Sequence, residues 1–220
     1  MAEFEISRDM LPDQPVGLFY AWWRGDYLPD LQTQPDLAIE FDPEPETIRR
    51  VADLDDREIE RRAGRGNRAV VGRMDGIPAA IGWSSGGRVE IGELGLDFTL
   101  PTGNRYVWDF VTLPDWRGRG IYPALLQAFI RVESSVDRFW VGHDLDNAAS
   151  SRGILKAGFQ TVGEVYAVEG VGPVFVARGG APDRAYDAAD LLGIPLLDSD
   201  AGDKIATSRG NPGAGEENHS

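Results

Sequence analysis

The feature that most constrains the fold is a strand-like run that passes through a glycine- and arginine-rich turn into an amphipathic helix, over residues 105–134. The turn reads Arg117-Gly118-Arg119-Gly120, and Pro123 suits the first helical turn, where its missing N–H costs nothing. Glycines let a backbone approach an anion, successive N–H groups of such a turn point the same way, and a helix N-terminus carries about half a positive charge. The segment therefore predicts a phosphate-binding turn.

Other phosphate-binding motifs fit this segment less well. A nucleotide P-loop is disfavoured because no Gly-Lys-Ser/Thr follows the turn. A dinucleotide fingerprint is disfavoured because no third glycine follows and the upstream strands are expected to be antiparallel. A surface turn with solubilising arginines is the remaining alternative.

The rest of the chain predicts an α/β sandwich with a mixed, mostly antiparallel sheet flanked by helices. Apolar residues at helical spacing, with Asp55 and Asp56 as capping residues, indicate two helices before the sheet. Asp75-Gly76 is a hairpin signal. Strands are expected over 68–72, 77–83, 88–100, 105–113, 138–143, 159–167 and 171–177, and later helices over 122–134 and 148–157.

The expected domain covers residues 46–178. Residues 1–45 contain six prolines and are expected to form an irregular segment packed on the domain. The apolar cluster Leu18–Trp23 within it is interpreted as packing, with a pocket wall as the alternative. Residues 179–220 are expected to be a largely disordered extension with a docked apolar patch at 191–197.

Composition excludes several classes of function. The chain has 220 residues, no Cys and only two His, which argues against disulfides, thiolate nucleophiles and a metal site built from Cys or His. A formal net charge of −14 argues against nucleic-acid binding, which needs a basic face. We expect no signal peptide and no membrane-spanning helix, and hence a cytoplasmic location.

A second motif lies downstream of the turn, in Asp146-Asn147-Ala148-Ala149-Ser150 and the following run to Gly158-Phe159. The two motifs together resemble the GNAT acetyltransferase superfamily: the turn resembles its Arg/Gln-x-x-Gly-x-Gly/Ala sequence, and the second motif resembles its Asn-x-x-Ala/Ser…Gly-Phe sequence. The resemblance covers about residues 69–177 and makes 46–178 a GNAT-like acyl-CoA-binding domain.

The resemblance implies acetyl-CoA as co-substrate and no metal. It implies that the turn binds the pyrophosphate, that the pantetheine arm pairs with the preceding strand, and that Asn147 contacts the cofactor or fixes the helix after it. The cofactor-binding residues implied are Val111, Thr112, Leu113, Arg117, Gly118, Arg119, Gly120, Ile121, Tyr122, Asn147 and Ser150. The implied reaction is direct attack of an amine on the thioester, with a small molecule or peptide as acceptor.

Such a reaction needs a proton acceptor for the ammonium and a proton donor for the leaving thiolate. Asp109 is the first candidate base, because a carboxylate inside an apolar strand is costly unless paired or hydrated; a pair with an arginine is the alternative. His143 is the second candidate, with a backbone-bonded strand-end histidine as the alternative. Tyr166 is a candidate acid, with sheet packing as the alternative.

Two positions depart from the family pattern. The sixth position of the turn motif is usually small but is Tyr122 here, and the position of the usual helix tyrosine is Ile154. Because that tyrosine is absent, a non-catalytic acyl-CoA-binding sensor or interaction module is the alternative function. A longer acyl donor is a further option if the Leu18–Trp23 cluster lines a pocket. The acidic surface favours cationic acceptors, and a homodimer paired through the strands of residues 159–176 is an option by analogy.

Overall fold

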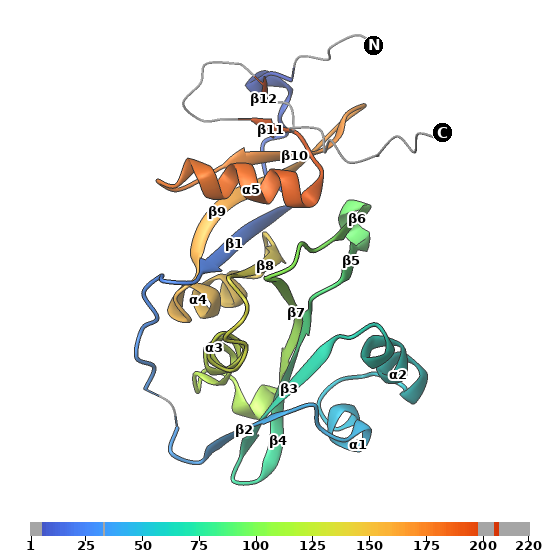
Figure 1. The fold of residues 1–220 in the computed structure, drawn as a ribbon, viewed down its shortest axis with the longest axis vertical. Helices are drawn as coiled ribbons and strands as arrows, with labels where there is room; N and C mark the ends of the chain where they lie inside the picture. Colours follow the sequence, from blue (N-terminus) through green and yellow to red (C-terminus); the bar gives the residue numbers. More distant parts are fainter. Residues whose placement is uncertain (1–5, 33, 198–204, 207–220) are drawn as a thin grey trace, which may run out of the picture.

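The computed structural model describes residues 6–32, 34–197 and 205–206, which form one large sheet with helices on both faces and a separate hairpin (Figure 1). The strands are β1 (Gly17–Trp23), β2 (Leu37–Phe41), β3 (Arg68–Met74), β4 (Ile77–Ser85), β5 (Arg88–Ile91), β6 (Leu96–Thr99), β7 (Asn104–Thr112), β8 (Arg138–Asp144), β9 (Gln160–Val168), β10 (Gly172–Ala177), β11 (Leu196–Leu197) and β12 (Ile205–Ala206). The helices are α1 (Pro45–Arg49), α2 (Asp56–Gly64), α3 (Ile121–Val132), α4 (Ala148–Lys156) and α5 (Pro182–Leu192), with short 3-10 turns at Arg8–Met10, Gly92–Leu94 and Pro114–Trp116.

The large sheet has the strand order β12-β11-β10-β9-β1-β8-β7-β4-β3-β2. Its neighbours are antiparallel except β7 with β8 and β10 with β11. The expected sandwich with a mixed, mostly antiparallel sheet is therefore confirmed.

Alternating side chains divide the core between the two faces of the sheet. On β3, Val70 packs with α3 and α4 on one face, whereas Val71 packs with α1 and α2 on the other. The second face continues under α5 and the β5–β6 hairpin, where Phe19 and Trp140 are buried. This period of two is what a strand buried on both faces requires.

Local signals in the sequence explain several of these elements. Asp55 caps α2, its side chain accepting the backbone N–H of Glu58 at 2.7 Å. Asp75 and Gly76 both take positive φ in the turn between β3 and β4, as a tight hairpin requires. The two helices before the sheet and the helices on either side of β8 are confirmed at the expected places.

The expectation of an irregular segment over residues 1–45 is wrong for β1 and β2. β1 lies inside the sheet, paired antiparallel with β8 on one edge and β9 on the other. Tyr20, Ala21 and Trp22 are almost fully buried there, so the apolar cluster is a strand of the core. The prolines that suggested irregular backbone flank these strands.

Two further expectations are corrected in the same way. Residues 88–100 form the hairpin β5–β6 and not one strand, because a 3-10 turn ends at Gly95 with φ +62° and reverses the chain. The extension after residue 179 contains α5 and β11, with Ala188 and Leu192 buried against the sheet, so it is ordered through residue 197. The disorder expected at 198–204 and 207–220 lies outside the described residues.

β9 cannot supply the strand pairing considered for a homodimer, because its two edges already pair with β10 and β1 of the same chain. Over the described ranges, no helix is both long and apolar enough to cross a membrane.

Candidate functional site

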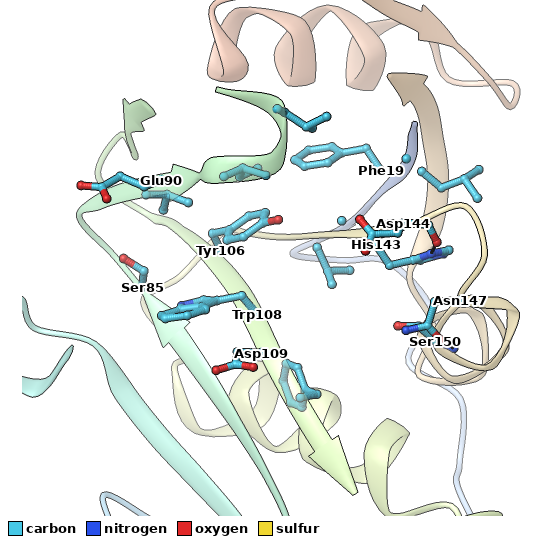
Figure 2. A pocket seen from close by; sticks show the side chains of 18 of the residues that line it. Phe19, Ser85, Glu90, Tyr106, Trp108, Asp109, His143, Asp144, Asn147 and Ser150 are labelled. Atoms are coloured by element: carbon cyan, nitrogen blue, oxygen red, sulfur yellow. Dashed lines mark hydrogen bonds between the residues drawn. The ribbon is translucent and has the colours of Figure 1, made fainter. Parts of the chain in front are cut away.

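The central feature of the site is a splayed pair of parallel strands. β7 and β8 pair only from Asn104 to Tyr106, opposite Arg138 to Trp140, and then separate. A cavity of about 500 Å³ lies between them, and Figure 2 shows side chains from both strands pointing into it. From β7 the lining is Tyr106, Trp108, Asp109 and Phe110; from β8 and α4 with its N-cap it is Val141, Gly142, His143, Asp144, Asn147 and Ser150.

A β-bulge shapes the wall contributed by β7. Trp83 of β4 faces Trp108 and Ile81 faces Val111, so the single residue Gly82 opposes two residues of β7. Asp109 is one of these two and has φ +50°, a conformation that Asp tolerates better than most residues. Bulges re-aim side chains beside functional sites, and this one turns the Asp109 carboxylate toward the cleft.

The Asp109 carboxylate is anchored from below by Arg62 of α2. Nη1 of Arg62 lies 2.5 Å from Oδ2 of Asp109, and Nε lies 2.8 Å from Glu58 Oε1. The guanidinium also stacks over the rings of Trp108 and Trp83, at 4.5 and 5.2 Å from their centroids. The expected alternative of a pair with an arginine is therefore present, but the carboxylate still lines the cleft, with its side chain 36% exposed.

The predicted phosphate-binding turn adopts the required backbone. Gly118 and Gly120 both have φ +76°, and Gly120 is the N-cap residue of α3. Among the described residues, the backbone N–H groups of Gly118, Arg119 and Gly120 have no acceptor. Nothing lies within 4 Å of the position a Cβ would take at Gly118, so the turn is open to a ligand.

The two arginines of the turn are exposed and lightly tethered. Arg117 Nε donates to the carbonyl oxygen of Thr112 at 3.0 Å. Arg119 stacks over Trp116 at 4.7 Å. Ile121, by contrast, is buried in the core under α3, so only its backbone can face a ligand.

Tyr122 leads from the turn into the cleft. Its ring packs beside Phe110, with ring centroids 5.0 Å apart, and against the backbone of Gly153, where a Cβ would lie 2.4 Å from the ring. Its hydroxyl lies 3.2 Å from the hydroxyl of Ser150, and burial raises the pKa of Tyr122 to about 12. Asn147 caps α4 by accepting the N–H of Ser150 at 3.0 Å. The structure thus brings Tyr122, Asn147 and Ser150 together on the cleft wall.

His143 is part of a hydrogen-bonded chain. Nδ1 lies 2.7 Å from the carbonyl oxygen of Asp144, and Nε2 lies 3.0 Å from the hydroxyl of Tyr20, which in turn lies 2.8 Å from that of Ser151. A carbonyl oxygen only accepts, so Nδ1 carries a proton in this arrangement, and in the tautomer with that one proton Nε2 accepts from the Tyr20 hydroxyl. Burial raises the pKa of Tyr20, in keeping with this donor role. His143 lines the cleft with both ring nitrogens already bonded.

The remaining predicted residues are the candidate acid Tyr166 and the β7 residues expected to pair with the pantetheine arm, and the structure supports them less well. Tyr166 is not among the residues that line the cleft: its hydroxyl donates to Glu164 at 2.9 Å, and it packs with Val168 and Val174. Both backbone groups of Leu113 are engaged, with Ala79 and Trp116. Val111 and Thr112 lie on β7 beyond the point where β8 leaves it, so the edge of β7 that faced β8 has no partner there among the described strands.

Several residues of the site were missed at the sequence level. Arg62 was missed because a charged residue in the middle of an amphipathic helix gives no sign that its side chain is buried. Tyr20 is not among the predicted residues because the surrounding prolines indicate irregular chain, although the alternation of Leu18, Tyr20 and Trp22 is a strand signal. Leu18 and Phe19 do line the cleft, as the alternative of a pocket wall suggested.

Comparison with known proteins gives structural likenesses only. No protein-family model and no curated protein sequence matches the chain. A GCN5-related N-acetyltransferase from Kribbella flavida is similar over 68% of this chain and 55% of its own, with 16% identity and a TM-score of 0.45. One from Sphaerobacter thermophilus is similar over 67% and 49%, with 16% identity and a TM-score of 0.47.

An IAA acetyltransferase from Bacillus cereus is similar over 59% of this chain and 79% of its own, with 16% identity and a TM-score of 0.42. The chain spans about half the length of the first two structures. All three of these structures are described as acetyltransferases, and two of them as GCN5-related N-acetyltransferases.

Proposed function

We propose that the protein is an N-acetyltransferase that takes an acetyl group from acetyl-CoA and transfers it to the amine of a small molecule or peptide. One observation carries the proposal: the cleft opened by the separation of β7 and β8 is lined by Tyr122, two residues after a glycine turn whose N–H groups have no acceptor among the described residues. An edge without a strand partner suits an extended ligand that bonds like an added strand. A turn of this kind at a helix N-terminus suits its phosphates.

The residues present fit acetyl-CoA. The N–H groups of Gly118, Arg119 and Gly120 would hold the pyrophosphate, and Arg117 and Arg119 add positive charge beside it. The N–H of Thr112 would pair with the pantetheine arm, whereas Val111 alternates with it and faces β4, as Leu113 does, and the Thr112 carbonyl oxygen already accepts from Arg117. When bound, acetyl-CoA supplies an activated thioester that an amine can attack directly.

The chain's own part in the reaction is to move protons at the cleft wall. Asp109 takes the proton of the acceptor ammonium, directly or through a water, while Arg62 fixes the carboxylate through Oδ2 and leaves Oδ1 to the cleft. The Tyr122 hydroxyl, protonated at neutral pH, and His143 are the proton carriers that line the opposite wall.

The test is a calorimetric titration of acetyl-CoA and CoA into the protein and a matched pair of variants. Gly118→Asp puts a carboxylate into the turn, whereas Gly118→Asn puts in the same shape without the charge, and both residues tolerate positive φ. Micromolar binding that Gly118→Asp abolishes and Gly118→Asn largely keeps supports the cofactor site. Absence of binding to folded wild type overturns it.

A non-catalytic acyl-CoA-binding module is the second candidate, favoured by one observation. Ile154, which occupies the usual tyrosine position, is fully buried in the core, and Tyr166 lies away from the cleft. This candidate requires tight CoA binding with no acetyl-CoA consumed across a broad amine panel. It also requires that Asp109→Asn leave the protein's biological role unchanged. An enzyme requires turnover that Asp109→Asn lowers. Both candidate functions are compatible with the cytoplasmic location that the sequence predicts.

A further inference from the structure

The end of the cleft formed by β5 and the chain at the end of α2 is lined by charges of both signs. Arg61, Arg65 and Asn67 reach it from the end of α2, and Arg88 and Glu90 reach it from β5. Figure 2 shows Glu90 across the cavity from Asn147 and Ser150. Three arginines therefore stand around one end of the cavity, each beside a carboxylate: Arg61 with Glu58, Arg65 with Glu90 and Arg88 with Asp97.

The three arginines differ in how many of their guanidinium N–H groups are already hydrogen-bonded to carboxylates. Arg61 is held by Glu58 through two bonds of 2.7 and 2.6 Å, and Arg88 is likewise held by two oxygens of Asp97. Arg65 makes a single long side-chain bond in the described part of the chain, from Nη1 to Glu90 at 3.3 Å. Since a guanidinium has five N–H donors, Arg65 keeps the paired donors that bind a carboxylate in a fork.

Asn67 supplies the complementary group. Its Oδ1 is buried and has no hydrogen-bond partner among the described residues, although the side chain lines the cleft. A buried acceptor without a partner is costly, and an N–H donor from a ligand would satisfy it. Gly66, with φ +76°, turns the chain between Arg65 and Asn67 so that both line the same cavity.

We propose that this end of the cleft binds an acceptor that carries a carboxylate beside its amine, as an amino acid does. Arg65 binds the carboxylate, and Asn67 Oδ1 accepts an N–H from the amine, which stands toward Asp109. The inference rests on the proposed function, because only an acetyltransferase has an amine acceptor. The binding of such a molecule can nevertheless be measured without acetyl transfer. The proposed site narrows the expectation from net charge, since the unused donors of Arg65 favour an acceptor that carries a carboxylate beside its amine.

The experiment measures binding of matched ligand pairs that differ by the carboxylate: phenylalanine and phenethylamine, tyrosine and tyramine, lysine and cadaverine, alanine and ethylamine. Each is titrated calorimetrically into the full chain, with and without CoA. The variants are Arg65→Gln, which keeps length and hydrogen-bonding ability, and Asn67→Leu. Arg57→Gln is the matched control, because Arg57 is exposed on the same helix and does not line the cleft.

In wild type and Arg57→Gln, the carboxylated member of at least one pair binds about tenfold tighter, a difference expected of one charge-assisted fork. Arg65→Gln brings that preference below about twofold, and Asn67→Leu weakens both members of the pair. A wild type without carboxylate preference, or an Arg65→Gln protein that keeps it, overturns the inference. Failure of the proposed function has a different signature: acetyl-CoA does not bind or is not consumed, while the carboxylate preference is still present.

Discussion

Arg62 is the residue whose removal tests most directly how the site is held together. Its side chain is 9% exposed, with ion pairs to Asp109 at 2.5 Å and Glu58 at 2.8 Å and two indole rings against its guanidinium. Removing one partner of a fully buried pair costs about 3–5 kcal/mol. Asp109 and Glu58 are 36% and 28% exposed, so water screens the charges left behind. We therefore expect Arg62→Met to cost about 2–3 kcal/mol in the free energy of unfolding.

The assay is urea unfolding at pH 7, supported by thermal unfolding, where this loss lowers the Tm by roughly 5–10 °C for a domain of this size. A double-mutant cycle with Asp109→Asn isolates the pair, and we expect a coupling of at least about 1 kcal/mol. The control is Arg61→Met, since Arg61 also pairs with Glu58 but is 47% exposed, and its loss should cost under about 1 kcal/mol. If Arg62→Met is no more harmful than Arg61→Met, the reasoning about the buried anchor is refuted.

Three further outcomes are expected. Hydrogen bonds from Arg61 and Arg62 lower the pKa of Glu58 from 4.5 to about 2, so its contribution to stability is present above pH 4.5 and is lost as the pH falls toward 2; Glu58→Gln should destabilise the fold in urea at pH 6 and not at pH 2. Burial raises the pKa of Tyr122 from 10 to about 12, so stability falls as the pH rises from 10 to 12; the absorbance titration of Tyr122→Phe should lack a tyrosine that ionises near pH 12, and an unchanged titration contradicts this. Gly153→Ala places a Cβ 2.4 Å from the Tyr122 ring and should cost about 1–3 kcal/mol of unfolding free energy, a loss that Tyr122→Ala in the same chain relieves.

The conformation of the glycine turn and the helix after it could be predicted because their signals are local. Glycines at Gly118 and Gly120 permit positive φ, and the apolar spacing after Tyr122 specifies a helix. The Asp109 bulge could not be predicted, because it arises from a mismatch between β4 and β7 that neither strand shows alone. The anchor at Arg62 and the contacts of Tyr20 depend on partners distant in sequence, and so do the pairings that make β1 a central strand.

The position of β1 has a consequence for how the chain reaches its fold. The strand is synthesised before both of its partners, since β8 and β9 begin about 120 and 140 residues after it. At about 5–20 residues per second, a ribosome leaves this apolar strand unpaired for roughly 6–30 s. During that interval both edges of β1, which carries Tyr20 and Trp22, lack their native hydrogen-bond partners. Another strand or a chaperone can bind to them. We expect β1 to be recruited last, so that its docking joins the two halves of the sheet and closes the cleft wall that carries His143.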